Sequence, residues 1–289
     1  MSLLLNLKEN KDMDNEAKLK AVINIYNVES SKMKPSTDKK QQFRDFCTIY
    51  LEMIRQIPTP KIQKQSRFEC VLVEFRILPH LEFLIRNSII KLGTEWSHTI
   101  VCGIENFEFL SSICSTISEN IRLIKLNVCN VNVSEYSNLL CSTEFWNLFH
   151  GDKILLYQED TCLFQSNIHD FLKWDYIGAS WPAHSNHNIK NVGNGGFSLR
   201  TRQSMLDVIK TKPHTDYGDI AEDVYFTKVL IEQNLGIVAN VEAADLFSTE
   251  YKFHPHCLGS HCFFLYNPYW KQILFQKVIV PYIQIFLNM

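Results

Sequence analysis

The hydrophobic and polar positions of the chain alternate between short apolar runs and amphipathic stretches. Cys70–Val73 is a continuous apolar run, a helical pattern extends from Leu81 to Ile90, and His98–Gly103 is a second apolar run. Continuous runs of this length are typical of strands buried on both faces, whereas apolar spacings of three and four residues are typical of helices. The pattern predicts a β-α-β unit whose ligand site lies at the carboxyl ends of its strands.

The same alternation continues through the rest of the chain. Further strands are predicted at Ile121–Leu126, at Lys153–Tyr157 and after the glycines of Val192–Arg200. Helices are predicted over Ser134–Phe149, Asn167–Lys173, Met205–Ile209 and from Ala221 onward. Together these elements predict an α/β fold in which a mixed sheet is flanked by helices.

The first 66 residues have a different pattern. Residues 1 to about 40 are rich in Lys, Asn, Asp and Ser, which predicts a polar and partly disordered leader. Apolar residues recur at helical spacing over Gln41–Ile57, and Pro58 would end that helix. We therefore expect an N-terminal helical appendage at residues 1–66 and a main domain at residues 67–289.

Composition and charge exclude several classes of protein. The 29 basic residues nearly balance the 31 acidic ones, so a nucleic-acid partner is not favoured. No segment contains the ~20 consecutive apolar residues of a membrane helix, and Leu3–Leu5 is too short for a secretory signal. Nine cysteines without a CxxC pair suit a reducing compartment, so we expect a cytoplasmic protein. His256–Cys257 and His261–Cys262 lack the spacing of a structural zinc site.

Acidic residues follow the strand predicted at Lys153–Tyr157. On an extended chain Gln158 and Asp160 should share one face, while Glu159 points the other way. Carboxylate oxygens are ligands that Mg²⁺ prefers, so Asp160 is the leading candidate for a metal ligand. Carboxylates in such turns also serve to cap the turn or simply face solvent, and that reading stays open.

A glycine-rich turn precedes the strand that ends at Arg200. Gly195 and Gly196 would let the backbone approach a ligand closely, and Arg200 could pair with a phosphate group. The turn matches neither the phosphate-binding P-loop nor the dinucleotide fingerprint, so an ordinary tight turn is the alternative.

Two carboxylates begin the helix predicted after Ala221. Asp223, with Glu222 second, is our candidate for the base that takes a proton from an attacking hydroxyl group. Acidic residues in a first turn are also stabilised by the helix dipole alone, which is the plainer explanation. His261 lies in a late histidine-rich loop, where a neutral imidazole could complete a cation site, although most such histidines are structural.

Five ordered segments carry a resemblance to a known family. They are VEFRILPHLEFLIRNSIIKLG, ILLYQEDTCLF, FLKWDYIGASW, VGNGGFSLR and EDVYF, and they span about residues 68 to 265. The chain resembles a family of glycosyltransferases known mainly as a domain of unknown function in bacteria and large DNA viruses. The order of motifs is also similar to that of Fringe-like and β-1,3-galactosyltransferase enzymes. The resemblance implies a GT-A-like, Rossmann-type fold, a nucleotide-sugar donor, Mn²⁺ or Mg²⁺, and a bacterial or host cytoplasm.

Site roles follow from the resemblance, position by position. Asp160 matches the last acid of an Asp-x-Asp motif and His261 the late metal-binding histidine, while Gln158 stands where the first aspartate is expected. That departure leaves one charge fewer for the cation. Asp223 matches the catalytic base. The remaining positions implied in donor binding are Glu74, Arg76, Glu159, Gly195, Gly196, Arg200 and Trp181, the last by stacking on a sugar.

The leading hypothesis is a transferase that moves a sugar, most simply from a UDP-sugar, to the hydroxyl group of an unidentified glycan, protein or small molecule. An inverting reaction would use Asp223, whereas a retaining reaction could use the same scaffold without it. The alternatives are a catalytically silent nucleotide-sugar or carbohydrate-binding module and a nucleotidyltransferase. The hypothesis requires Asp160, Asp223 and His261 to surround one cleft.

Overall fold

The fold is built around one mixed sheet. The computed structural model describes residues 2–31, 36–182, 184–185, 187–218 and 220–289. The strands of its six-stranded sheet are β1 (Phe68–Val73), β2 (Trp96–Cys102), β3 (Arg122–Lys125), β4 (Lys153–Tyr157), β6 (Tyr176–Ile177) and β7 (Phe197–Thr201). Their order is β3-β2-β1-β4-β7-β6. The first four in this order are parallel, whereas β7 is antiparallel to β4 and β6 is antiparallel to β7.

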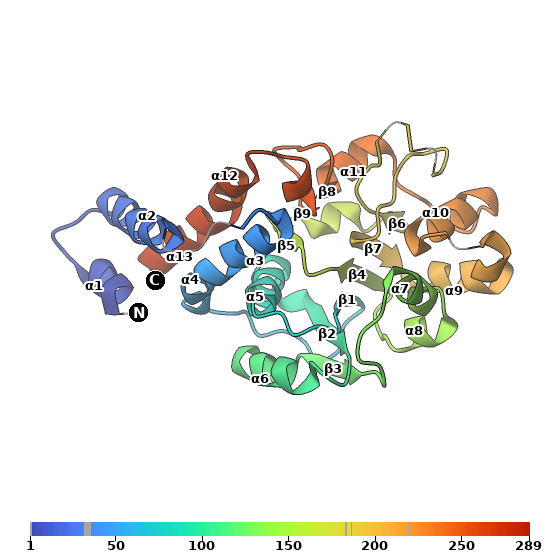
Figure 1. Ribbon diagram of the computed structural model, residues 1–289, viewed down its shortest axis with the longest axis horizontal. Helices are drawn as coiled ribbons and strands as arrows, with labels where there is room; N and C mark the ends of the chain where they lie inside the picture. The colour runs from blue at the N-terminus through green and yellow to red at the C-terminus, as the bar shows by residue number, and fades with distance from the viewer. Residues whose placement is uncertain (1, 32–35, 183, 186, 219) are drawn as a thin grey trace.

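Helices cover both faces of this sheet. Cys70 and Leu72 pack with one set of helices and Val71 and Val73 with the other, because successive strand residues point to opposite faces. The first set contains α5 (Leu81–Leu92) and α6 (Phe107–Ile117). The second contains α7 (Val133–Leu140), α8 (Thr143–Asn147), α9 (Arg202–Thr211) and α10 (Glu222–Glu232). The predicted α/β fold, a mixed sheet flanked by helices, is confirmed (Figure 1).

A smaller sheet lies beside the end of β4. It consists of β5 (Thr161–Leu163), β8 (Ser248–Thr249) and β9 (Gly259–His261), in the order β5-β9-β8. Helix α11 (Val241–Phe247) leads into β8. Antiparallel pairing places His261 opposite Thr161, which joins the late part of the chain to the turn after β4.

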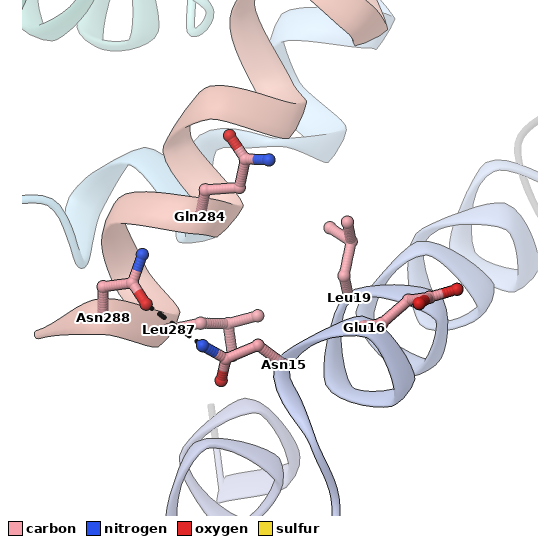
Figure 2. A pocket seen from close by; sticks show the side chains of 6 residues that line it. All are labelled: Asn15, Glu16, Leu19, Gln284, Leu287 and Asn288. Atoms are coloured by element: carbon pink, nitrogen blue, oxygen red, sulfur yellow. Dashed lines mark hydrogen bonds between the residues drawn. The ribbon is translucent and has the colours of Figure 1, made fainter.

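The two ends of the chain lie together. Helices α1 (Ser2–Glu9) and α2 (Asn15–Ser31) lie at the same end of the molecule as α13 (Val280–Asn288) (Figure 1). Figure 2 shows α2 beside α13, where the Asn15 side chain donates a hydrogen bond to Asn288 Oδ1 (3.2 Å). Most of the predicted polar, partly disordered leader is therefore helical, although Lys34 and Pro35 lie outside the described residues. The domain boundary near residue 66 stays a prediction.

Several predicted helices are divided or shortened. The helix predicted at Gln41–Ile57 is two helices, α3 (Lys39–Ile49) and α4 (Leu51–Arg55). The helix predicted at Ser134–Phe149 is also divided, because the Ser142 side chain caps a new helix, α8, by accepting from the backbone N–H of Phe145. The remaining short helices are η1 (Gly93–Glu95), η2 (Ile168–Phe171), η3 (His214–Tyr217), η4 (Phe263–Leu265), α12 (Trp270–Leu274) and the π-helical turn η5 (Phe275–Ile279). None of the helices in the described part of the chain has the length and apolar character needed to cross a membrane.

Candidate active site

The carboxyl edge of the main sheet gathers the first predicted site residues. Because β1 and β4 are parallel, Glu74 and Gln158 follow them at the same edge. Strand β7 enters this edge from the opposite direction, with Phe197 paired to Tyr157. The glycine turn before β7 therefore lies next to the turn after β4, and the backbone N–H of Gln158 donates to the carbonyl oxygen of Gly196 (3.0 Å).

The smaller sheet brings His261 to the same place. The backbone N–H of Cys262 donates to the carbonyl oxygen of Asp160 (3.2 Å), which fixes the two loops against each other. His261 Nε2 lies 3.3 Å from Asp160 Oδ1 and 3.2 Å from Gln158 Oε1. Gln158 and Asp160 thus both face His261, but the segment is a turn closed by the N–H of Thr161 on the carbonyl oxygen of Gln158 (3.1 Å) and not the extended chain from which this was predicted.

The Asp160–His261 pair is buried and charged. Burial alone would raise the pKa of Asp160, but the neighbouring His261 and Lys40 hold it well below its usual value. Burial alone would lower the pKa of His261. The Asp160 carboxylate has the larger effect and raises the pKa of His261 well above its usual value. The pair is therefore an ion pair at neutral pH in this structure.

The donor atoms at this point suit a metal ion. One ligand atom each from Asp160, His261 and Cys262 lie within 4.8 Å of one another. Asp160 Oδ1 and His261 Nδ1 are buried and make no hydrogen bond within the described residues; Oδ1 has an ion-pair contact with His261 Nε2 (3.3 Å), and Nδ1 lies 3.7 Å from the buried Glu250 Oε2. Such buried polar atoms without partners are uncommon in folded proteins. A carboxylate and an imidazole fit Mn²⁺, and a thiolate from Cys262 would add a softer ligand.

Glu159 faces away from His261 and into a cluster of cations. Its carboxylate accepts hydrogen bonds from Arg44 Nη2 (2.7 Å) and Nε (3.1 Å) and lies 3.1 Å from His80 Nε2. Arg76 Nη2 also reaches it at 3.3 Å. Burial raises the pKa of Glu159, but His80 and Arg44 outweigh this and lower it to about 2. Glu159 thus holds positively charged side chains at the sheet edge.

The glycine turn is packed so tightly that both glycines are required. A Cβ atom on Gly196 would collide with the ring of His261, and one on Gly195 would collide with the Glu222 carboxylate. The backbone N–H of Gly195 donates to Asp223 Oδ2 (2.9 Å). The turn therefore lies between His261 on one side and the start of α10 on the other, which brings Asp160, His261 and Asp223 to one region.

Asp223 is partly buried, and its carboxyl group is a weaker acid than usual. Its side chain is half-buried, in the first turn of α10. Loss of water contact and the nearby Glu222 carboxylate raise its pKa to about 7, even though the N–H of Gly195 and the charge of Arg200 oppose the shift. A carboxylate with a pKa near the working pH is suited to general base catalysis.

Arg200 and Glu222 form an ion pair in the interior of the protein. Arg200 is fully buried and forms a two-pronged ion pair with Glu222, at 2.6 and 3.0 Å. Its guanidinium group also lies 4.6 Å from the ring centre of Tyr176. The prediction that Arg200 binds a donor phosphate does not agree with this arrangement, because the guanidinium group has no exposed surface. Glu222, as the second candidate base, is likewise held by Arg200.

A cleft opens at the sheet edge beside these residues. Its volume is about 370 Å³, and it is lined by Lys40, Val73, Glu74, Phe75, Arg76, Asn130, Val131, Asn132, Val133, Tyr136, Gln158, Glu159 and Asp160. Glu74 holds Arg76 through both carboxylate oxygens, at 2.7 Å each. A second hollow of about 420 Å³ shares Asn130 and Val131 with the cleft. The predicted donor-binding residues Glu74, Arg76, Gln158 and Glu159 therefore line one cavity with Asp160.

Trp181 is one of several predicted site residues that do not line this cleft; the others are Gly195, Gly196, Arg200, Glu222, Asp223 and His261. The Trp181 side chain is buried, its ring lies 4.8 Å from that of His187, and its backbone N–H donates to Asn191. It does not appear in the lining of the cleft, and its sugar-stacking role stays a prediction.

Sequence reasoning missed several residues around the site, among them Lys40, Arg44, His80, Tyr136 and Cys262. Lys40 and Arg44 lie four residues apart on one face of α3, as in any amphipathic helix, and the sequence contains no signal that this face meets Glu159. Cys262 directly follows the predicted metal ligand His261. This adjacency is the one feature of the sequence that could have suggested Cys262 as a further ligand.

Comparisons with known proteins give a partial family match and distant structural similarities. Residues 120–261, just under half of the chain, match a family described as "Protein of unknown function (DUF5672)". No curated protein sequence matches the chain significantly.

Three solved structures illustrate the structural similarities. The apo form of the glycosyltransferase GlyE of Streptococcus pneumoniae TIGR4 is 10% identical with a TM-score of 0.47, and the match covers 77% of this chain and 62% of GlyE. The inositol-1-phosphate CTP transferase of T. maritima is 11% identical with a TM-score of 0.46, covering 77% and 97% of the two chains. Apo mouse xyloside xylosyltransferase 1 is 12% identical with a TM-score of 0.44, covering 67% and 96%. Similarities at this level say nothing about activity. Any proposal about activity therefore rests on the geometry of this chain.

Proposed function

We propose that this protein is a glycosyltransferase with a GT-A-like fold, which transfers a sugar from a nucleotide-sugar donor to an acceptor hydroxyl group with the help of a divalent cation. The observation that carries the proposal is the meeting of Asp160, His261 and Asp223 around the Gly195–Gly196 turn, beside a cleft at the carboxyl edge of the sheet. These side chains come from three distant parts of the chain.

The cleft has the chemistry that a nucleotide diphosphate requires. Arg76 and Lys40 supply positive charge to its lining, and Gln158 and Asp160 line it as well. Asp160 and His261 would hold Mn²⁺ or Mg²⁺ there, and the cation would stabilise the negative charge on the departing diphosphate without a proton transfer.

In this proposal Asp223 activates the acceptor. Its Oδ2 atom is fixed by the N–H of Gly195, and its raised pKa lets it accept a proton near neutral pH. In an inverting reaction it would take the proton of the attacking hydroxyl group. The acceptor would then enter on the Asp223 side of the glycine turn, and the donor on the Glu74 side.

Turnover of nucleotide sugars tests the proposal. The protein is incubated with Mn²⁺ and a panel of nucleotide sugars and acceptors, and release of the nucleoside diphosphate is measured. Replacement of Asp223 by Asn should reduce transfer by about 100-fold or more, because general base catalysis contributes about that factor. Donor affinity should stay unchanged. Asp216→Asn, which changes an exposed carboxylate on a neighbouring segment, is the matched control. Full turnover by Asp223→Asn would refute the role of the base.

One observation favours a second candidate, a nucleotide-sugar-binding module without catalytic activity. Gln158 replaces a carboxylate, and Lys40 already pairs with Asp160 at 2.9 Å. Both features weaken attraction for a cation. Calorimetry separates the two functions, because a module would bind a nucleotide sugar while no acceptor in the panel gives turnover.

A further inference from the structure

Helix α3 of the N-terminal segment covers the acidic residues of the candidate site. Lys40 Nζ lies 2.9 Å from Asp160 Oδ2 and 3.0 Å from Glu159 Oε1, so one ammonium group bridges the two carboxylates. Both carboxylate side chains are 2% exposed, whereas the Lys40 side chain is 37% exposed. Lys40, Glu159 and Asp160 all line the cleft at the sheet edge, and Lys40 is the most exposed of the three.

Helix α3 is held by Arg44 on Glu159 and also by contacts that do not involve the acidic pair. The Asp38 side chain caps α3 by accepting from the backbone N–H of Lys40 (2.8 Å). Phe43 is fully buried and stacks on Phe264 with 5.0 Å between the ring centres. Helix α3 is thus anchored by its apolar face, and the Lys40 side chain can leave the carboxylates while the helix stays in place.

An ammonium group and a divalent cation need the same carboxylate oxygens. The two cannot share Asp160 Oδ2 at close range, because like charges a few ångströms apart repel strongly in a poorly hydrated site. The oxygen that Lys40 contacts also accepts a hydrogen bond from Cys262 Sγ (3.0 Å), and Cys262 belongs to the ligand cluster with Asp160 and His261.

We propose that Lys40 is a built-in competitor of the divalent cation: its ammonium group occupies the cation's place on Asp160 and must be displaced when a cation binds. The inference rests on the cation site of the proposed function. It gives the N-terminal segment a role, since α3 then sets the affinity of the site for a metal ion.

Direct measurement of Mn²⁺ binding tests the competition. Calorimetry or electron paramagnetic resonance of free Mn²⁺ is applied to the full chain without nucleotide or acceptor. Lys40→Met should bind Mn²⁺ about tenfold more tightly than the wild type, which corresponds to the loss of one partly buried ion pair. Lys39→Met is the matched control, because Lys39 lies on the same helix but donates to the carbonyl oxygen of Leu265. It should bind like the wild type.

A second measurement uses the unmodified protein. Amine-reactive labelling followed by mass spectrometry should modify Lys40 faster after Mn²⁺ is added, with Lys39 labelled at an unchanged rate. The inference is overturned if Lys40→Met binds Mn²⁺ no more tightly than the wild type, if neither binds Mn²⁺, or if Mn²⁺ leaves Lys40 labelling unchanged. Failure of the proposed function would look different: tighter Mn²⁺ binding by Lys40→Met, together with no sugar transfer by any form of the protein.

Discussion

At the scale of single residues, the environment of Asp223 sets the pH dependence that we expect of the proposed reaction. Loss of water contact and the proximity of Glu222 raise its pKa to about 7. A base with a raised pKa is protonated and inactive below that pH, and ionised and active above it. The backbone N–H groups of Gly195 and Val224 donate to this carboxylate and oppose the rise in its pKa, but they do not cancel it.

We therefore expect the transfer rate to rise with pH through about 7. On the acidic side the rate should fall by about tenfold for each pH unit, because only the ionised carboxylate accepts the proton. Steady-state rates between about pH 5.5 and 8.5 check this. Asp216→Asn should keep the same profile. A rate that is flat over this range, or that falls as pH rises, would contradict the role of Asp223.

The residue scale also shows where sequence reasoning stops. Asp160, His261 and Asp223 were predicted because each stands at a recognisable motif. Lys40 could not be predicted, because its partner Asp160 is 120 positions later and any lysine on a helix face looks the same in sequence. Arg200 misled the prediction for a related reason: burial, and not residue type, decides whether a guanidinium group is free to meet a phosphate.

At the scale of elements, the Arg200–Glu222 pair fastens helix α10 to strand β7. Replacing Arg200 by Met removes one partner of a buried ion pair and leaves Glu222 without compensation. We expect a loss of about 3–5 kcal/mol of folding free energy. Urea unfolding measures it. The control is Arg67→Met, because Arg67 is 71% exposed and its ion pair with Asp152 is long (3.7 Å), so its loss should cost less than about 1 kcal/mol. Equal losses in the two variants would contradict the structural role of Arg200.

The elements differ in how well the sequence predicts them. Strand β4 was predicted with its observed bounds, because a fully buried strand is a continuous apolar run. Strands β5, β8 and β9 contain two or three residues each and are too short to show a period. Helices α1 and α2 were missed because their polar composition resembles that of a disordered segment, while packing against α13 is a tertiary effect.

At the scale of the whole molecule, several remote segments converge on one edge of the sheet. Parallel β1 and β4 place Glu74 and Asp160 there, the smaller sheet adds His261, and the glycine turn connects this group to Asp223. The N-terminal segment closes over the acidic residues through Lys40. The sequence alone predicted the edge, the motifs and an N-terminal amphipathic helix, but the contact of that helix with Glu159 and Asp160 emerged only from the fold.

Cation-dependent binding of a nucleotide sugar tests the central claim most directly. Thermal unfolding is followed with a panel of nucleotide sugars, with and without Mn²⁺, for the wild type and Asp160→Asn. A ligand at about 100 times its dissociation constant should stabilise the protein by ~2.7 kcal/mol. We predict that at least one nucleotide sugar raises the unfolding temperature of the wild type only when Mn²⁺ is present, and that Asp160→Asn abolishes this effect. Stabilisation that is equal without Mn²⁺, or that persists in Asp160→Asn, would contradict a cation site at Asp160 and His261.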